Sequence, residues 1–158
     1  QPCGWGKDRI QEFAERIATT WGYKPGDDLE KLVKKLGGTV EAGDIGEVLT
    51  TGSMTVTGPG KFLISLSPLS GSKRSRFTIA HELGHYVLHS QLGERPVFVK
   101  RDGSGPVEWE ANWFAAGFLM PEREFRAKLG AGWGNAELAV HFDVSEAAVQ
   151  VRRQSLGV

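Results

Sequence analysis

The chain has 158 residues, of which 40% are hydrophobic and 24% are charged, and this balance fits one compact globular domain and argues against a disordered segment. The 19 Lys and Arg residues balance 19 Asp and Glu residues, so bulk electrostatic attraction to nucleic acid or to an anionic membrane is not indicated. Cys3 is the only cysteine, which excludes an intramolecular disulfide, and the absence of a bilayer-length apolar run or a signal-peptide pattern leads us to expect a cytoplasmic protein with no membrane contact.

The first part of the chain predicts two helices followed by a small sheet. Apolar residues recur at helical spacing over 9–21, and a second helix is expected over 28–36, with Asp27 or Asp28 as its N-terminal cap. From residue 39 the pattern changes to short β-rich runs, at 39–41, 48–50, 54–57 and 61–66. The last two runs flank a Gly-Pro-Gly turn, which is typical of a hairpin, and together the runs predict a small, mostly antiparallel sheet of about three strands.

The second part of the chain is predominantly helical. A long helix is expected from Ser70 or Ser72 through His89, and the connection over 90–107 contains one short strand pattern at 97–99. Helical patterns follow in order at about 107–119, 122–129, 136–142 and 146–156. These patterns predict an α+β fold in which the sheet packs on the helices.

Residues 136–158 form the second of two predicted units, after a main domain over 1–135. Two short helices with an intervening turn are similar to a helix-turn-helix. DNA-reading units are basic, whereas this segment has two arginines against three acidic residues. We therefore expect a helical pair that packs on the main domain, and we do not expect it to bind nucleic acid.

Residues 81–85 read His-Glu-Leu-Gly-His, in the middle of the predicted long helix. One helical turn separates His81 from His85, so both imidazoles can reach one metal ion. Glu82 projects to the side of that face, where it can take a proton from a metal-bound water, whose pKa zinc lowers to about 7. The motif predicts a Zn²⁺ site with His81 and His85 as ligands and Glu82 as the general base.

The third ligand is expected from the next helix, because a catalytic zinc usually has three protein ligands. Glu108 lies on a face with small residues that would permit close packing against the zinc helix, so we favour it over Glu110, which remains the alternative. Asn112 shares that face and is expected to hydrogen-bond the outer nitrogen of a zinc-bound histidine. His89 is expected to lie outside the ligand set, because one helix cannot direct three successive turns at one small ion.

Around these motifs the sequence resembles the ImmA/IrrE family of metallopeptidases. The segments RFTIAHELGHYVLH and EWEANWFAAGFLMP are similar to that family's HELGH helix and its E-x-E-A-N-x-F-A-A-x-L-L-M-P helix, with Phe118 where the family often has Leu. The resemblance is strong over residues 60–125. It implies a small zinc peptidase of gluzincin type, with His81 and His85 as ligands, Glu82 as base and an acid of the 108–112 segment as third ligand.

The resemblance also implies a protein substrate. Family members typically cleave a helix-turn-helix repressor encoded beside them, so a zinc metalloendopeptidase acting on a repressor is the favoured function. Two alternatives stay open: a DNA-binding or repressor-interacting regulatory module, or a toxin-like protein, each with a structural or degenerate metal site. In gluzincin-like arrangements the strand at 61–66 would form the sheet edge above the metal, where an extended peptide can pair. Specificity would then come from the 90–107 connection and the C-terminal helices.

Overall fold

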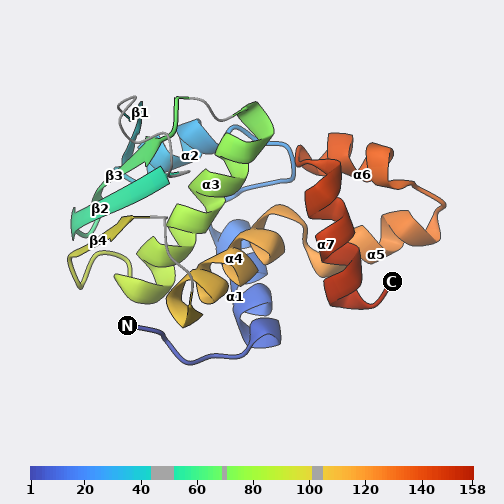
Figure 1. Ribbon diagram of the computed structural model, residues 1–158, viewed down its shortest axis with the longest axis horizontal. Helices are drawn as coiled ribbons and strands as arrows, with labels where there is room; N and C mark the ends of the chain where they lie inside the picture. Colours follow the sequence, from blue (N-terminus) through green and yellow to red (C-terminus); the bar gives the residue numbers. More distant parts are fainter. Residues whose placement is uncertain (44–51, 69–70, 101–104) are drawn as a thin grey trace.

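A sheet lies at one end of the molecule and three C-terminal helices lie at the other. The helix that carries the HELGH motif and the helix that carries Glu108 lie between them (Figure 1). The computed structural model describes residues 1–43, 52–68, 71–100 and 105–158. Among these residues the helices are α1 (Lys7–Thr20), α2 (Leu29–Lys35), α3 (Ser72–Gly84), the π-helical turn η2 (His85–His89), α4 (Pro106–Leu119), α5 (Glu122–Gly130), α6 (Asn135–Phe142) and α7 (Glu146–Leu156). The strands are β1 (Thr39–Ala42), β2 (Gly52–Gly58), β3 (Lys61–Leu66) and β4 (Val97–Lys100).

The predicted α+β fold is confirmed, and its sheet has four described strands in the order β1-β3-β2-β4. Strand β2 is antiparallel to both β3 and β4, whereas β1 runs parallel to β3. The hairpin expected across the Gly-Pro-Gly turn is the β2–β3 pair, with a register shift between Val56 and Gly58. The pattern at 97–99 forms the additional strand β4, and the run at 48–50 lies outside the described residues.

The expectation that residues 61–66 form the sheet edge is wrong. Strand β3 pairs with β1 on one side and with β2 on the other, so β1 and β4 occupy the two edges of the described sheet. Burial explains this order, because Ile64 of β3 is fully buried whereas three of the four residues of β1 are exposed. The more apolar strand takes the interior position, and a polar strand covers it.

Local capping sets where two of the helices begin. Of the two candidates for the start of α2, Asp28 is the cap, because its Oδ1 accepts from the backbone N–H of Glu30 at 2.9 Å and of Lys31 at 3.2 Å. Ser145 caps α7 in the same way, accepting from the N–H of Ala148 at 3.0 Å. No helix among the described residues is long and apolar enough to cross a bilayer.

Helices α1 and α4 pack closely at the centre of the core. Fully buried side chains line this contact, among them Ile10 and Ala14 of α1 and Phe114 and Phe118 of α4. Gly117 permits the close approach, because a Cβ atom at this position would lie 2.7 Å from the backbone carbonyl oxygen of Gln11. The position of α4, and of the acidic residues at its start, therefore depends on a small residue facing α1.

The C-terminal helices are attached to the rest of the fold by both apolar and polar contacts. Phe142, Val144 and Val149 are buried. The Arg76 Nε donates to the Asp143 carbonyl at 3.0 Å, and Lys73 Nζ donates to the Val144 carbonyl at 3.1 Å. These bonds connect the start of α3 to the turn between α6 and α7, so the pair packs against the main body.

We expect Gly117→Ala to destabilise the protein, since its new methyl group would overlap the α1 backbone, at a cost of about 1–3 kcal/mol in the free energy of unfolding. Gly130→Ala is the matched control, because nothing lies within 4 Å of a Cβ atom at the end of α5. Urea unfolding followed by circular dichroism measures both. Equal stability of the two variants would contradict the close α1–α4 contact.

Candidate metal centre

The two histidines of the HELGH motif lie on a helix that runs through the interior of the protein. Every residue from 78 to 90 is buried, and His81, Glu82 and His85 each have an exposed fraction of 0%. Polar side chains in such a place need partners, because an unpaired buried polar group costs free energy. The two imidazoles find partners on α4 and η2.

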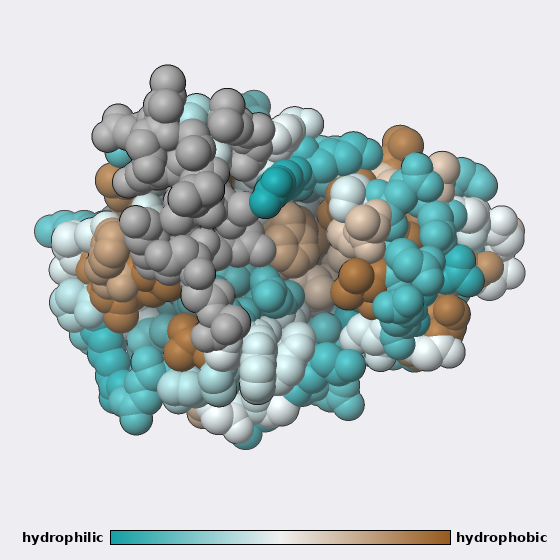
Figure 2. Space-filling model, viewed as in Figure 1, coloured by the Kyte–Doolittle hydropathy of each residue, from teal (hydrophilic) through white to brown (hydrophobic). Residues whose placement is uncertain are grey.

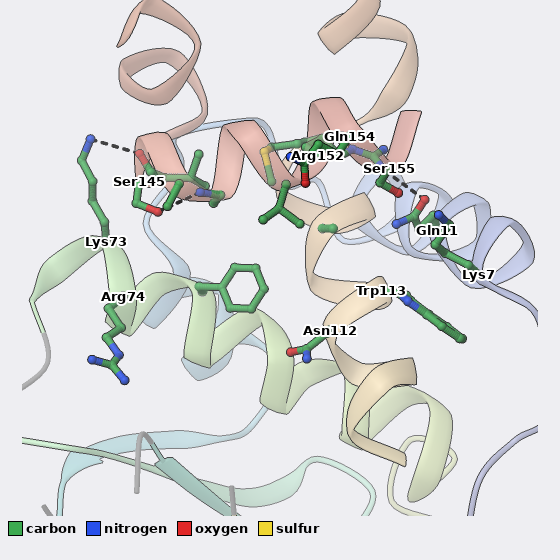
Figure 3. Close-up of a pocket in the computed structure, with 17 residues that line it drawn as sticks. Lys7, Gln11, Lys73, Arg74, Asn112, Trp113, Ser145, Arg152, Gln154 and Ser155 are labelled. Carbon is green, nitrogen blue, oxygen red and sulfur yellow. Dashed lines mark hydrogen bonds between the residues drawn. The ribbon is translucent and has the colours of Figure 1, made fainter. Parts of the chain in front are cut away.

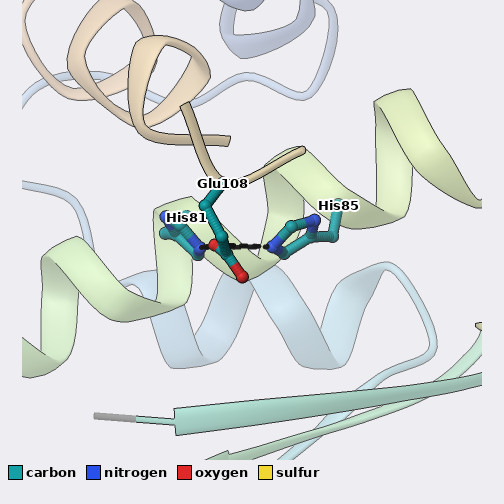
Figure 4. A group of neighbouring side chains, drawn as sticks. All are labelled: His81, His85 and Glu108. Atoms are coloured by element: carbon teal, nitrogen blue, oxygen red, sulfur yellow. Dashed lines mark hydrogen bonds and ion pairs between the residues drawn. The ribbon is translucent and has the colours of Figure 1, made fainter. Parts of the chain in front are cut away.

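Three donor atoms converge on one point between α3, η2 and α4 (Figure 4). The Nε2 atoms of His81 and His85 are 3.2 Å apart, and Glu108 Oε2 lies 2.6 Å from the first and 3.3 Å from the second. Bonds of about 2.0–2.1 Å to a tetrahedral ion imply about 3.3–3.4 Å between donor atoms. Two of the three separations match that geometry, and the shortest is a hydrogen bond that an ion between the groups would widen.

Glu108 reaches this point because it stands on the first turn of α4, where the helix crosses α3. Its side chain is 13% exposed. Burial alone would raise the pKa of Glu108, but the hydrogen bonds and positive charge of His81 and His85 hold that pKa far below its usual range. The carboxyl group is therefore ionised at neutral pH and suited to a cation.

Asn112 lies one turn further along α4 and contacts the other side of the first imidazole. Its Oδ1 atom is 2.7 Å from His81 Nδ1. An amide oxygen only accepts hydrogen bonds, so Nδ1 carries a proton, and Nε2 is the nitrogen that faces the convergence point, where a bound cation would take the place of its proton. The structure thus brings Asn112 against the outer nitrogen of His81.

His85 has an equivalent outer partner in His89, which belongs to η2. The Nδ1 atoms of the two rings are 2.9 Å apart, and His89 Nε2 is 2.8 Å from Glu110 Oε1. Burial lowers the pKa of His89, and the Glu110 carboxylate only partly offsets this, so the ring is neutral. Its Nε2–H then donates to Glu110 and its Nδ1 accepts from His85, so Nε2 of His85 is the nitrogen that faces the convergence point.

Glu110 therefore points away from the three converging donors. Besides His89, its two oxygens accept from the backbone N–H groups of Cys3 and Gly4, each at 2.9 Å. Burial alone would raise the pKa of Glu110, but these three hydrogen bonds lower it. The i+4 spacing of His85 and His89 signals their contact, whereas nothing in the sequence signals the hydrogen bond between His89 and Glu110.

Glu82 lies on the sheet-facing side of α3. A Cβ atom at Gly52, the first residue of β2, would be 3.8 Å from Glu82 Oε1. The carboxylate is thus enclosed between the motif helix and the sheet, beside the two converging imidazoles. Burial of a carboxyl group beside a cation site is the environment in which general bases are found.

The two tyrosines of the chain are engaged elsewhere. Tyr86 OH accepts from the Gly60 N–H at 3.0 Å and its ring stacks on Phe62. Tyr23 OH accepts from Arg76 Nη2 at 2.8 Å. Both hydroxyls therefore have structural roles in joining α3 or η2 to neighbouring loops.

Comparisons with known proteins give the family and the fold of the chain. Residues 34–153, about three quarters of the chain, match the peptidase M78 family model, described as the IrrE N-terminal-like domain. No curated protein sequence matches the chain. Among solved structures, a Mycobacterium tuberculosis transcriptional regulator superposes with a TM-score of 0.64 at 22% sequence identity.

That superposition covers 90% of this chain but only 45% of the regulator. At this identity the likeness shows a shared fold. The family match extends from the end of α2 into α7, and it includes both helices that carry the converging donors. The chain therefore belongs to the peptidase M78 family, whose model is the IrrE N-terminal-like domain.

Proposed function

We propose that this protein is a zinc-dependent endopeptidase that hydrolyses a peptide bond in a specific protein partner, a helix-turn-helix transcriptional repressor. The observation that carries the proposal is the convergence of His81, His85 and Glu108, with a buried carboxylate, Glu82, beside them. Membership of a peptidase family supports the same reaction class.

Zinc fits the donor set best, because two imidazole nitrogens and one carboxylate oxygen form a common catalytic zinc site that leaves a fourth position open. When bound, zinc supplies the Lewis acidity that makes a water molecule nucleophilic at neutral pH. His81 and His85 would hold it through Nε2, since their Nδ1 atoms face Asn112 and His89. Glu108 would be the third ligand, and Glu110 would act through His89.

Glu82 is proposed to move the proton. Its carboxylate takes a proton from the attacking water and delivers it to the amide nitrogen that leaves. The enclosed position between α3 and β2 keeps this carboxylate away from bulk solvent.

The substrate is proposed to bind as an extended peptide that pairs with the edge strand β4. Strand β3, which the sequence suggested for this role, lies inside the sheet. Strand β4 pairs with β2 only, among the described residues, and it precedes the helix that carries Glu108. Phe98 on this strand is 68% exposed. An edge strand offers backbone groups to an incoming segment, and such pairing carries little side-chain information.

A repressor as partner is supported by the resemblance to ImmA/IrrE peptidases and by the fold shared with a transcriptional regulator. Direct DNA binding by the C-terminal pair has less support. Arg152, one of its two arginines, is buried with an exposed fraction of 1%, and Arg153 bonds to Asn135. Neither guanidinium is presented for a phosphate backbone.

We expect purified protein to hold one zinc ion per chain, and Glu108→Ala to lose it. Glu110→Ala should retain stoichiometric zinc with an affinity about 10–100-fold weaker, because it removes a partner of His89 rather than a donor. Atomic absorption after dialysis and competition with a chelator measure both. If only the Glu110 variant lost zinc, the third ligand would be Glu110 and the assignment to Glu108 would be wrong.

For the general base, Glu82→Gln should keep zinc and lower peptide hydrolysis by roughly two to four orders of magnitude, because Gln cannot accept the proton. Glu94→Gln, on an exposed residue, controls for the substitution itself. If the Glu82 variant remained fully active, another group would have to move the proton.

The outer shell of His81 gives a third test. Asn112→Ala should weaken zinc binding by about 10–100-fold, because His81 loses the acceptor that orients its ring. Asn112→Asp keeps an acceptor oxygen in the same place and should retain most of the affinity. Similar losses in both variants would mean that the amide serves packing rather than orientation.

A further inference from the structure

A cavity of about 880 Å³ separates the C-terminal pair from the main body. Helices α1, α3 and α4 form its floor, and α7 forms its opposite wall (Figure 3). In the space-filling view it appears as a hollow with apolar side chains at its base, beside the C-terminal helices (Figure 2). Its size falls within the range of about 300–1,000 Å³ that ligand pockets occupy.

The lining combines apolar walls with positive charge. Phe77, Trp113, Met120, Val144 and Val151 supply the apolar surface. The charged residues of the lining are Lys7, Lys73, Arg74 and Arg152, and none of the lining residues that the structure describes is Asp or Glu. The whole chain has equal numbers of basic and acidic residues, so this segregation of charge is local.

The cations stand at the two ends of the cavity. In Figure 3, Lys7 and Arg152 lie at the α1 end, whereas Lys73 and Arg74 lie at the start of α3. Asn112 lies between these ends, and Trp113 lies at the α1 end close to Lys7. An occupant that matches this surface combines apolar groups with carboxylates towards its ends.

Arg152 is a buried cation with unused hydrogen-bonding capacity. Its Nε donates to the Met120 carbonyl at 3.0 Å and its Nη1 to Gln11 Oε1 at 2.9 Å, and the charges of Glu15 and Glu122 also act on it. Its Nη2, and the hydroxyl of the neighbouring Ser155, have no hydrogen-bond partner among the described residues. Both residues line the cavity, so a carboxylate that entered it could accept hydrogen bonds from the Arg152 Nη2 group and the Ser155 hydroxyl.

The cavity also shares a wall with the candidate metal centre. Asn112 lines it and, at the same time, holds His81 Nδ1 at 2.7 Å. A chain segment lying in the cavity would therefore pass within one side chain of the converging donors. A segment in the cavity would contact the outer side of His81, away from the sheet-facing side of α3 where Glu82 lies, so it would hold a partner at a distance from the scissile bond.

We propose that this cavity is a substrate-recognition site that binds an acidic segment of the protein partner, with apolar residues between its carboxylates. The inference rests on the proposed endopeptidase function, because it assigns the occupant to the substrate. Charge complementarity supplies steering and selectivity, and the apolar walls supply buried area. Recognition away from the scissile bond accounts for selection of one partner when strand pairing alone reads little sequence.

The test is binding of fluorescein-labelled synthetic peptides to zinc-loaded Glu82→Gln protein, followed by fluorescence anisotropy. One peptide alternates Glu with Leu, and matched peptides replace Glu by Gln or by Lys. Because the Glu82→Gln variant is not expected to hydrolyse the peptide, binding is measured separately from hydrolysis. If the wild-type protein hydrolysed no peptide, the proposed function would be overturned. If the variant bound no peptide, the recognition site would be overturned.

Two changes locate the site. Ala148→Trp fills the cavity from α7, and Ala127→Trp on the exposed face of α5 is its control. The double variant Lys7→Glu with Arg74→Glu reverses the charge of two lining residues, and Lys31→Glu with Lys34→Glu on exposed positions of α2 changes the net charge equally. The charge variant keeps the test decisive if the tryptophan prevents folding.

We expect the Glu peptide to bind more tightly than the Gln and Lys peptides, and more weakly as salt is raised. The cavity charge variant should weaken it by roughly tenfold or more, and the α2 variant should leave it unchanged. Equal affinity for the three peptides, or equal effects of the two charge variants, would overturn the proposal. Millimolar decanoate serves as a competitor. If decanoate displaced the Glu peptide and bound more tightly than that peptide, the cavity would be assigned to a small carboxylate and the proposal would be overturned.

Discussion

The close crossing of α3 and α4 is the contact on which the candidate metal centre depends. Gly84 sits at this crossing, and a Cβ atom there would lie 3.0 Å from the Cβ of Phe114. The absence of a side chain lets α4 approach until the carboxylate of Glu108 meets two imidazoles of the other helix. A wider separation would remove the third donor without disturbing either helix, so the small residue inside the motif serves geometry more than chemistry.

The buried polar groups around this crossing form one connected set, in which each ring nitrogen of His81, His85 and His89 faces a polar group. Asn112 orients one imidazole, and the pair of His89 and Glu110 orients the other. Such a set is stable only when its members are satisfied together, because a half-paired buried group costs more than an apolar replacement. The centre is therefore preorganised by partners that contribute no donor atom of their own.

Local patterns were enough to predict the helices, the hairpin and the residues at the centre. Helical spacing places His81 and His85 on one face, and the Asp28 and Ser145 caps mark helix starts that a single sequence reveals. Strand order could not be predicted in this way, because pairing of β1 with β3 and of β4 with β2 joins segments that are far apart in the chain. The π-helical turn that brings His89 Nδ1 to His85 Nδ1, and the amides of Cys3 and Gly4 on Glu110, likewise depend on tertiary packing.

The hydrogen bonds of the first residues to Glu110 place a thiol close to the candidate metal centre. Cys3 is the only thiol in the sequence, and it lies one carboxylate and one imidazole away from His85. A fluorophore attached to this thiol would lie beside the outer partners of His85. Burial raises the pKa of the Cys3 thiol, so labelling needs mildly alkaline solution. The same proximity means that oxidation or alkylation of this one sulfur during purification would disturb the backbone amides that hold the outer carboxylate, and so would alter the site that a biochemist sets out to measure.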